Sequence, residues 1–381
     1  AFGGRDSGVA NRGSGSQTVQ TNSLTISNTN APGTVGILTP GAQTVLAFGN
    51  LTVQTANATG GAKIATSAGT QTVGASGLMT VQVTGGGGTA AIDATTGTQT
   101  IRGTSASTAD PGAAASSGSA SGGVRVQVAG GSGGTARIAN SGGAQTIIAA
   151  YVDVHTAAAG TAVVSASGDQ AVHTTNGLAN SGGSLRVAAI GGGSATLSSG
   201  GAQLLQIDYP ELMQGARDGR ITVGDPTATG VSAIRAVDQD IFARSIAIRG
   251  GSAAGAHASI DVSGVQNISL VNSTSTPGGS LTVQGGAGGN AILDPTAQTI
   301  LSNVPISVVG GSGTGVIGGI LAGGDQIIMV TTGGASSIAA QGGSGTDAFG
   351  RITTTGPSLQ VGTSGDIALT AGSGSNADGV M

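Results

Sequence analysis

The densest group of ionisable side chains lies between positions 208 and 249, which hold eleven of the thirty charged residues (13 basic plus 17 acidic). The strongest candidates for a site among them are Asp208, Glu211, Asp218 and Arg220. Two carboxylates can act as general acid and base on a glycosidic bond, and an arginine can hold a uronate through paired hydrogen bonds. One hypothesis is therefore a β-helical carbohydrate-active enzyme, or a glycan-binding module, that acts on extracellular polysaccharide.

Two features favour a structural interpretation of the same segment. Acidic and basic residues alternate along it, as expected for ion pairs at a surface. Aromatic residues, which usually form the platforms of sugar-binding clefts, make up only 2% of the chain. We therefore predict that the chain is not an enzyme, that it has no catalytic residues, and that residues 206–250 form a charged, irregular segment.

Motifs for metals and cofactors are weak. The chain has no Cys, and its three histidines are too far apart in sequence for a local zinc site. Residues 342–349 match one copy of a calcium-binding nonapeptide, which works only in tandem, and the similar stretch 310–317 has Gly315 where the aspartate should be. Residues 313–318 fit a dinucleotide-binding pattern, but no helix is expected after them. We predict no metal and no cofactor.

The main signal is a recurring tripeptide, Gln-Thr-Val or Gln-Thr-Ile with variants. Its glutamines recur at intervals of 25 to 46 residues, and a branched aliphatic residue stands two positions after each one. The middle position is chemically mixed, so it should face outward while its two neighbours face inward. We predict a stacked, hydrogen-bonded ladder of the inward amides. Its members are Gln17, Gln43, Gln71, Gln99, Gln145, Gln170, Gln203, Gln239, Gln266, Gln298 and Gln326.

Two further short apolar segments follow the tripeptide in most repeats. The second alternates apolar and polar residues, as in residues 51–53 and 281–283, and the third ends on a single aliphatic residue such as Ile64 or Ile92. Three short strands cannot bury an inward face alone, so such a coil is stable only when it is stacked on others. The sequence predicts an all-β fold, a parallel β-solenoid (β-helix) of about twelve three-strand coils.

Composition excludes several other classes. The 74 glycines do not recur at every third position and the chain has only 9 prolines, so it is not collagen. It is rich in Val, Ile and Thr, and its net charge is only −4, which argues against disorder. The single lysine, Lys63, and the absence of a basic stripe argue against nucleic acid as a partner. No apolar run is long enough for a transmembrane segment.

The departures from the repeat suggest the organisation of the chain. We expect an N-terminal extension at 1–16, a solenoid at 17–371 with a flexible Ser/Ala/Thr/Gly-rich insertion at 104–121, and a C-terminal tail at 372–381. Neither end resembles a capping helix. We therefore expect copies to stack head to tail into a homopolymer, with residues 1–15 adding a strand across the joint. The rival hypothesis is a piece of a longer protein whose flanks supply the caps.

Residues 183–187 (GSLRV) and 279–286 (GSLTVQGG) resemble the repeats of filamentous-haemagglutinin-like and autotransporter-type β-helical adhesins. The resemblance is one of repeat style and extends over most of the chain. It implies an extracellular or bacterial cell-surface location and a role in adhesion, matrix or biofilm. We thus expect a secreted structural β-solenoid, a subunit of a filament, matrix or adhesin, with further copies of itself and host or matrix glycans as partners.

Overall fold

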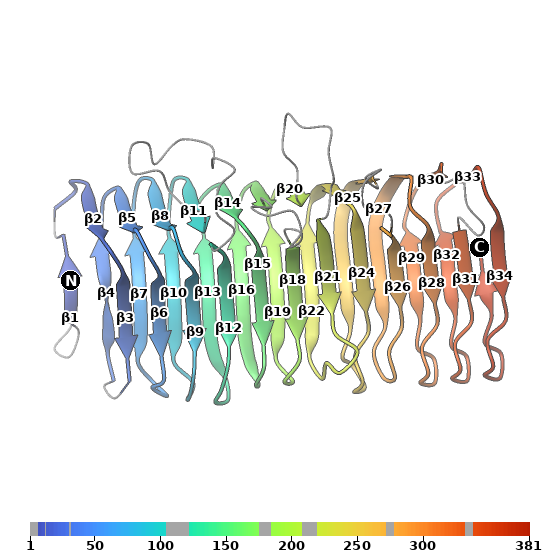
Figure 1. The fold of residues 1–381 in the computed structure, drawn as a ribbon, viewed down its shortest axis with the longest axis horizontal. Coiled ribbons are helices and arrows are strands. Elements are labelled where there is room, and N and C mark those ends of the chain that lie inside the picture. Colours follow the sequence, from blue (N-terminus) through green and yellow to red (C-terminus); the bar gives the residue numbers. More distant parts are fainter. Residues whose placement is uncertain are drawn as a thin grey trace. The chain divides into compact units, whose positions relative to one another are not determined.

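The computed structural model describes residues 7–11, 13–29, 32–103, 122–174, 184–207, 219–271, 278–331 and 338–381. These residues form short parallel β-strands joined by tight corners, with no helix among them (Figure 1). They divide into two compact units, Ala1–Ser184 with Gly193–Gly201, and Leu185–Gly192 with Ala202–Met381. Each unit is a parallel β-solenoid, which confirms the predicted fold class.

In the first unit, each coil supplies one strand to each of three ladders, and every strand pairs in parallel with its equivalent in the next coil. The strands are β1 (Ser7–Ala10), β2 (Gln17–Thr21), β3 (Leu24–Asn28), β4 (Thr34–Thr39), β5 (Gln43–Ala47), β6 (Leu51–Thr55), β7 (Gly61–Thr66), β8 (Gln71–Ala75), β9 (Met79–Val83), β10 (Thr89–Ala94), β11 (Gln99–Gly103), β12 (Val124–Val128), β13 (Gly134–Asn140), β14 (Gln145–Ala149), β15 (Val152–Thr156), β16 (Gly160–Ala166), β17 (Gln170–Thr174) and β19 (Ser194–Ser199).

The second unit follows the same plan and contains nearly all of β18 (Ser184–Ala189). Its two longest strands, β25 and β27, each run through a corner and serve two ladders, with a register shift between Val262 and Val265. The other strands complete the coils between and around them. The strands after β19 are β20 (Ala202–Ile207), β21 (Arg220–Gly224), β22 (Val231–Ala236), β23 (Asp238–Ala243), β24 (Ser245–Arg249), β25 (Ala258–Leu270), β26 (Leu281–Gln284), β27 (Ala291–Ser302), β28 (Ile306–Val309), β29 (Gly318–Ala322), β30 (Gln326–Val330), β31 (Ile338–Gln341), β32 (Gly350–Thr354), β33 (Leu359–Thr363), β34 (Ile367–Thr370) and β35 (Gly379–Val380).

The core consists of columns of aliphatic side chains, because strict alternation turns every second residue of a strand inward. Val73 and Ile101 are fully buried and stand in register on adjacent coils, while Thr72 and Thr100 beside them are only half-buried. In the third ladder, Ile64 pairs with Ile92 in the same way. The predicted inward and outward positions of the tripeptide are thus confirmed in the described coils.

Glycine is needed at corners where backbones of adjacent coils approach closely. At Gly86 the φ angle is +65°, and a Cβ would lie 2.5 Å from the backbone nitrogen of Ala58. A side chain at this corner would therefore meet both a strained backbone and a clash with the coil beside it. This requirement accounts for part of the chain's high glycine content.

Strands extend beyond the solenoid limits that the sequence suggested. Strand β1, within the expected N-terminal extension, pairs with β4 of the same chain, and β35, within the expected tail, pairs with β32. Residues 219–249 of the expected irregular segment form the regular strands β21 to β24. Charged residues there, such as Asp238, Asp240 and Arg249, occupy outward positions and leave the ladders intact. The expected insertion 104–121 lies outside the described residues.

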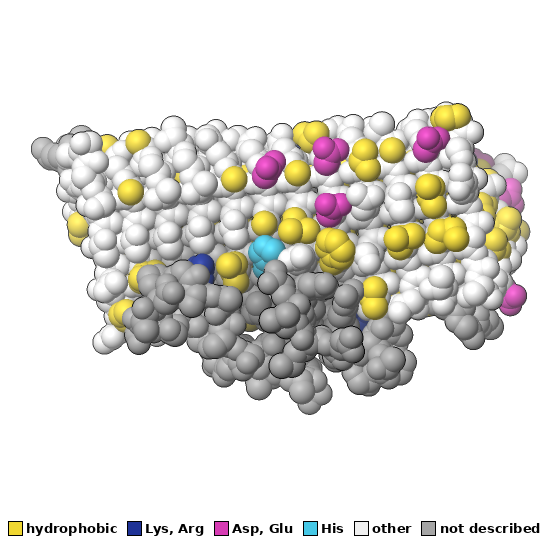
Figure 2. All heavy atoms as spheres, turned by 90° about the horizontal axis from the view of Figure 1, so that it is seen from above, with side chains coloured by type: hydrophobic (Ala, Val, Ile, Leu, Met, Phe, Trp, Pro, Cys, Tyr) yellow, Lys and Arg dark blue, Asp and Glu magenta, His cyan; other side chains and the backbone are white. Residues whose placement is uncertain are grey.

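The described surface carries few charges. In the view of Figure 2, scattered acidic and hydrophobic side chains lie among neutral polar and backbone atoms. Among the described residues, no helix has the length and apolarity needed to cross a membrane.

Candidate functional sites

The glutamines of the repeat form hydrogen-bonded amide ladders inside both units. In each step the Nε2 of one glutamine donates to the Oε1 of the glutamine one coil earlier, at 2.6–3.0 Å in the first unit and 2.6–2.7 Å in the second. The side chains are buried, with 0–2% exposure except for 8% at Gln17. The predicted ladder is therefore present within each unit. Its role there is structural, because each buried amide needs a hydrogen-bond partner and the amide of the neighbouring coil supplies one.

The ladder of the second unit ends on an unsatisfied atom. Gln326 is fully buried, and its Nε2 donates to Gln298, but no donor reaches its Oε1 among the described residues. The reason lies in the sequence: Leu359 stands in register where the next glutamine would be. A buried acceptor without a partner costs about 1–3 kcal/mol.

Of the four sequence-predicted site residues, Arg220 is the one that lies within the described part of the chain. Asp208, Glu211 and Asp218 lie outside the described residues. Arg220 is exposed at the start of β21, where its backbone pairs with Ser245, and no ion-pair partner for it is found in the described part of the chain.

Other charged residues of the 208–249 segment have structural partners. Asp225 lies 3.6 Å from Arg186 and accepts hydrogen bonds from the backbone and hydroxyl of Thr227. Burial opposes the ionisation of Asp225, but these hydrogen bonds and the charges of Arg186 and Arg249 outweigh it and lower its pKa. Such contacts agree with the interpretation of this segment as an ion-paired surface.

A pair of carboxylates that the sequence analysis did not single out lies on adjacent coils of the second unit. Asp261 pairs in register with Asp294, beside a hollow of about 400 Å³. The Nε of Arg235 lies 3.3 Å from Asp261, and Ser259 donates to the same carboxylate at 2.9 Å. Burial and the charge of Asp261 raise the pKa of Asp294. The sequence signal for this pair is that Asp261 and Asp294 occupy equivalent positions of consecutive repeats. The register shift between Val262 and Val265 makes that equivalence hard to recognise from the sequence.

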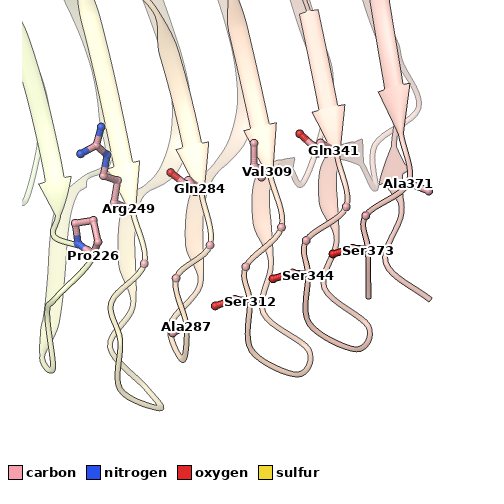
Figure 3. A pocket seen from close by; sticks show the side chains of 18 residues that line it. Pro226, Arg249, Gln284, Ala287, Val309, Ser312, Gln341, Ser344, Ala371 and Ser373 are labelled. Atoms are coloured by element: carbon pink, nitrogen blue, oxygen red, sulfur yellow. The ribbon is translucent and has the colours of Figure 1, made fainter. Parts of the chain in front are cut away.

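A groove of about 750 Å³ lies in the second unit where strands of the second ladder turn into the third (Figure 3). One rim consists of the strand-end residues Arg249, Gln284, Val309 and Gln341, which are in register. The opposite rim carries serines, and glycines form the floor between them. The sequence analysis missed this groove because it treated the glycine runs only as corners.

The calcium-type motif at 342–349 is explained by the same turns. Asp347 has a φ angle of +53°, and Gly255, Gly315 and Asn376 also have positive φ in the corresponding turns of other coils, at 81°, 69° and 54°. Gly, Asn and Asp are the residues that tolerate this backbone conformation best. Asp347 is therefore accounted for as a turn residue.

The histidines have separate surroundings. His155 lies 3.1 Å from Asp153, and His257 accepts the backbone N–H of Asn290, while His173 is in register with Ile148. Among the described residues, no group of three or more His, Asp or Glu side chains could hold a metal ion.

Comparisons with protein-family models, with curated proteins and with solved structures found no match to this chain.

Proposed function

We propose that the chain is a structural repeat protein of the bacterial exterior, a secreted or cell-surface β-solenoid that builds a filament, matrix or adhesin. The observation that carries this proposal is the pair of internal amide ladders, in which buried hydrogen bonds connect successive coils of each unit. A construction in which every coil supports its neighbours suits a mechanical role. The resemblance in repeat style to β-helical adhesins supports the extracellular location.

Self-stacking is the second part of the proposal. At strand β34, the core residues Ile367 and Leu369 are 45% and 52% exposed, whereas Ile338 and Ala340 beneath them are 0% and 1% exposed. An open aliphatic column of this kind is best covered by another coil of the same design. We assign the first coil of a second copy, β2 to β4, to this position, because it would continue all three parallel ladders.

This head-to-tail joint requires β1 to change its position. If β2 stacks on β33 and β3 stacks on β34, then β4 must stack on β35, and that edge of β4 is the one that β1 occupies. The expectation that residues 1–15 would reach across the joint is therefore replaced, because β1 must leave β4 before the joint can close. Gly8 controls this contact, since a Cβ there would lie 1.9 Å from the carbonyl oxygen of Gly36.

Static light scattering and electron microscopy on the purified chain test the self-stacking. We expect concentration-dependent filaments, and Gly8→Val should promote them by releasing β1. Val9→Ala is the matched control, because Val9 is 57% exposed and its loss should leave β1 in place. A chain that stays monomeric at high concentration, with and without Gly8→Val, would refute self-stacking and favour flanking sequence as the cover.

The enzyme hypothesis is tested separately with acidic polysaccharides, by measuring unsaturated products and reducing ends. We expect no turnover. Turnover that disappears in Asp294→Asn or Asp261→Asn, or in Glu211→Ala, would overturn the structural proposal in favour of a carbohydrate-active enzyme.

A further inference from the structure

The groove of the second unit is a hollow with polar rims and a floor without side chains. The rim residues Gln284 and Gln341 and the opposite residues Ser312 and Ser344 are exposed, and no hydrogen-bond partner of these four side chains is found among the described residues (Figure 3). Equivalent strands of a parallel sheet are about 4.8 Å apart. Gln284 and Gln341 stand two coils apart with Val309 between them, while Ser312 and Ser344 belong to adjacent coils, so the rims present amide and hydroxyl groups along the stacking direction.

The glycine floor is fixed by the fold. A Cβ at Gly286 would lie 2.2 Å from the carbonyl oxygen of Gly251, and one at Gly343 would lie 1.9 Å from that of Gly311. Side chains cannot fill the trough at these positions, so it is a permanent feature of these coils.

The backbone of the floor is already hydrogen-bonded, which decides against a peptide strand as the ligand. The N–H groups of Gly285, Gly310 and Gly342 donate to carbonyls of the next coil, and those of Gly311 and Gly343 donate within their own turns. A peptide that binds by strand addition needs free main-chain donors and acceptors. The groups left for a ligand are hydroxyl and amide side chains, which match the hydroxyl groups of a glycan.

The charge of the lining residues indicates which class of glycan the groove favours. Arg249 lines one end of the groove, and no Asp or Glu is among the lining residues. A guanidinium binds a carboxylate with good geometry. We propose that this groove binds a linear acidic polysaccharide, which lies along the stacking direction with a uronate carboxylate at Arg249 and its hydroxyl groups on the Gln284, Ser312, Gln341 and Ser344 side chains. The inference rests on the proposed extracellular role and names the glycan that the surface takes.

Isothermal titration of the full chain with hexagalacturonate tests this site, with cellohexaose as the neutral probe. We expect the acidic probe to bind more tightly. Arg249→Gln should remove that preference, and the double variant Gln284→Ala/Gln341→Ala should weaken binding about tenfold, since each lost hydrogen bond contributes modestly. Ser344→Phe should block the groove, because Ser344 is exposed at its rim and the new ring would lie over the floor.

Gln360→Phe is the control, since Gln360 is exposed on β33 outside the groove. Circular dichroism verifies that each variant keeps its fold. No heat with either probe at millimolar concentration, equal affinity for the two probes, or binding that survives Ser344→Phe would overturn the inference. These results do not depend on self-stacking, so failure of the groove and failure of the filament proposal are distinguishable.

Discussion

Replacing Leu359 with glutamine should extend the amide ladder of the second unit by one step. The Oε1 of Gln326 is buried without a donor, and Leu359 occupies the next position in register. In the existing ladder, each later glutamine donates its Nε2 to the earlier one at 2.6–2.7 Å. A glutamine at 359 is therefore expected to donate to Gln326.

The magnitude follows from two opposing terms. Satisfying a buried acceptor recovers about 1–3 kcal/mol. Leu359 is only partly buried, so the loss of its packing costs less than the roughly 2–5 kcal/mol of a core leucine truncation. We expect Leu359→Gln to increase the free energy of local unfolding of β33 by about 1 kcal/mol, measured as slower amide hydrogen exchange in β30 and β33.

Leu359→Glu and Leu359→Met are the matched controls. Glutamate has the shape of glutamine but an ionised carboxylate has no donor, so it should destabilise β33. Methionine keeps similar volume without polarity and should have little effect. If hydrogen exchange in β33 were no slower with glutamine than with methionine, the ladder would not be the cause of stability at this end.

The other predictions concern the core, a turn and pH. Val73→Asp should destabilise the first unit by several kcal/mol because it buries an unpaired charge, whereas Thr72→Asp should cost under about 1 kcal/mol; chemical denaturation compares them, and equal sensitivity would contradict the assigned faces. Asp347→Gly should raise the melting temperature, since glycine adopts positive φ without strain, and an unchanged or lower value would argue that the carboxylate has a further role. The raised pKa of Asp294 means that its contribution to stability is fully present below the ordinary aspartate pKa and is lost as the pH rises through the raised value. Asp294→Asn should therefore stabilise the chain at pH 7 but not at pH 3, as judged by thermal melts, and equal effects at both would exclude burial of the Asp294 carboxylate and its repulsion by Asp261 as the cause.

The repeat predicted the fold because one pattern reports both the strand period and the stacking. Gln71, Thr72 and Val73 specify an inward amide, an outward residue and a core residue, and the next coil repeats them in register at Gln99. A register error by one residue would turn the whole set around. The local alternation and the repeat spacing therefore give the same answer, and the structure agrees with both.

The groove and the carboxylate pair could not be predicted in the same way. Their residues, such as Arg249 and Gln284, or Asp261 and Asp294, are 33 to 35 positions apart and become neighbours only through the exact number of residues in each coil. The bulge between Val262 and Val265 changes that number locally. Outward positions also tolerate many residue types, so they carry no pattern that a single sequence can reveal.

The described part of the charged segment, residues 219–249, shows that surface charge is compatible with regular strands. Charge at a position says little about strand formation when the side chain faces solvent, because the ladder depends on the backbone and on the inward residues. Around Gln239, the outward residues Asp238 and Asp240 accept hydrogen bonds from Val265 and Asn267 of the next coil, while Ile241 remains fully buried. These carboxylates reinforce the coil contact. The inward column, with its amide and its aliphatic side chain, decides whether a coil forms, and the outward column is free to carry the binding chemistry.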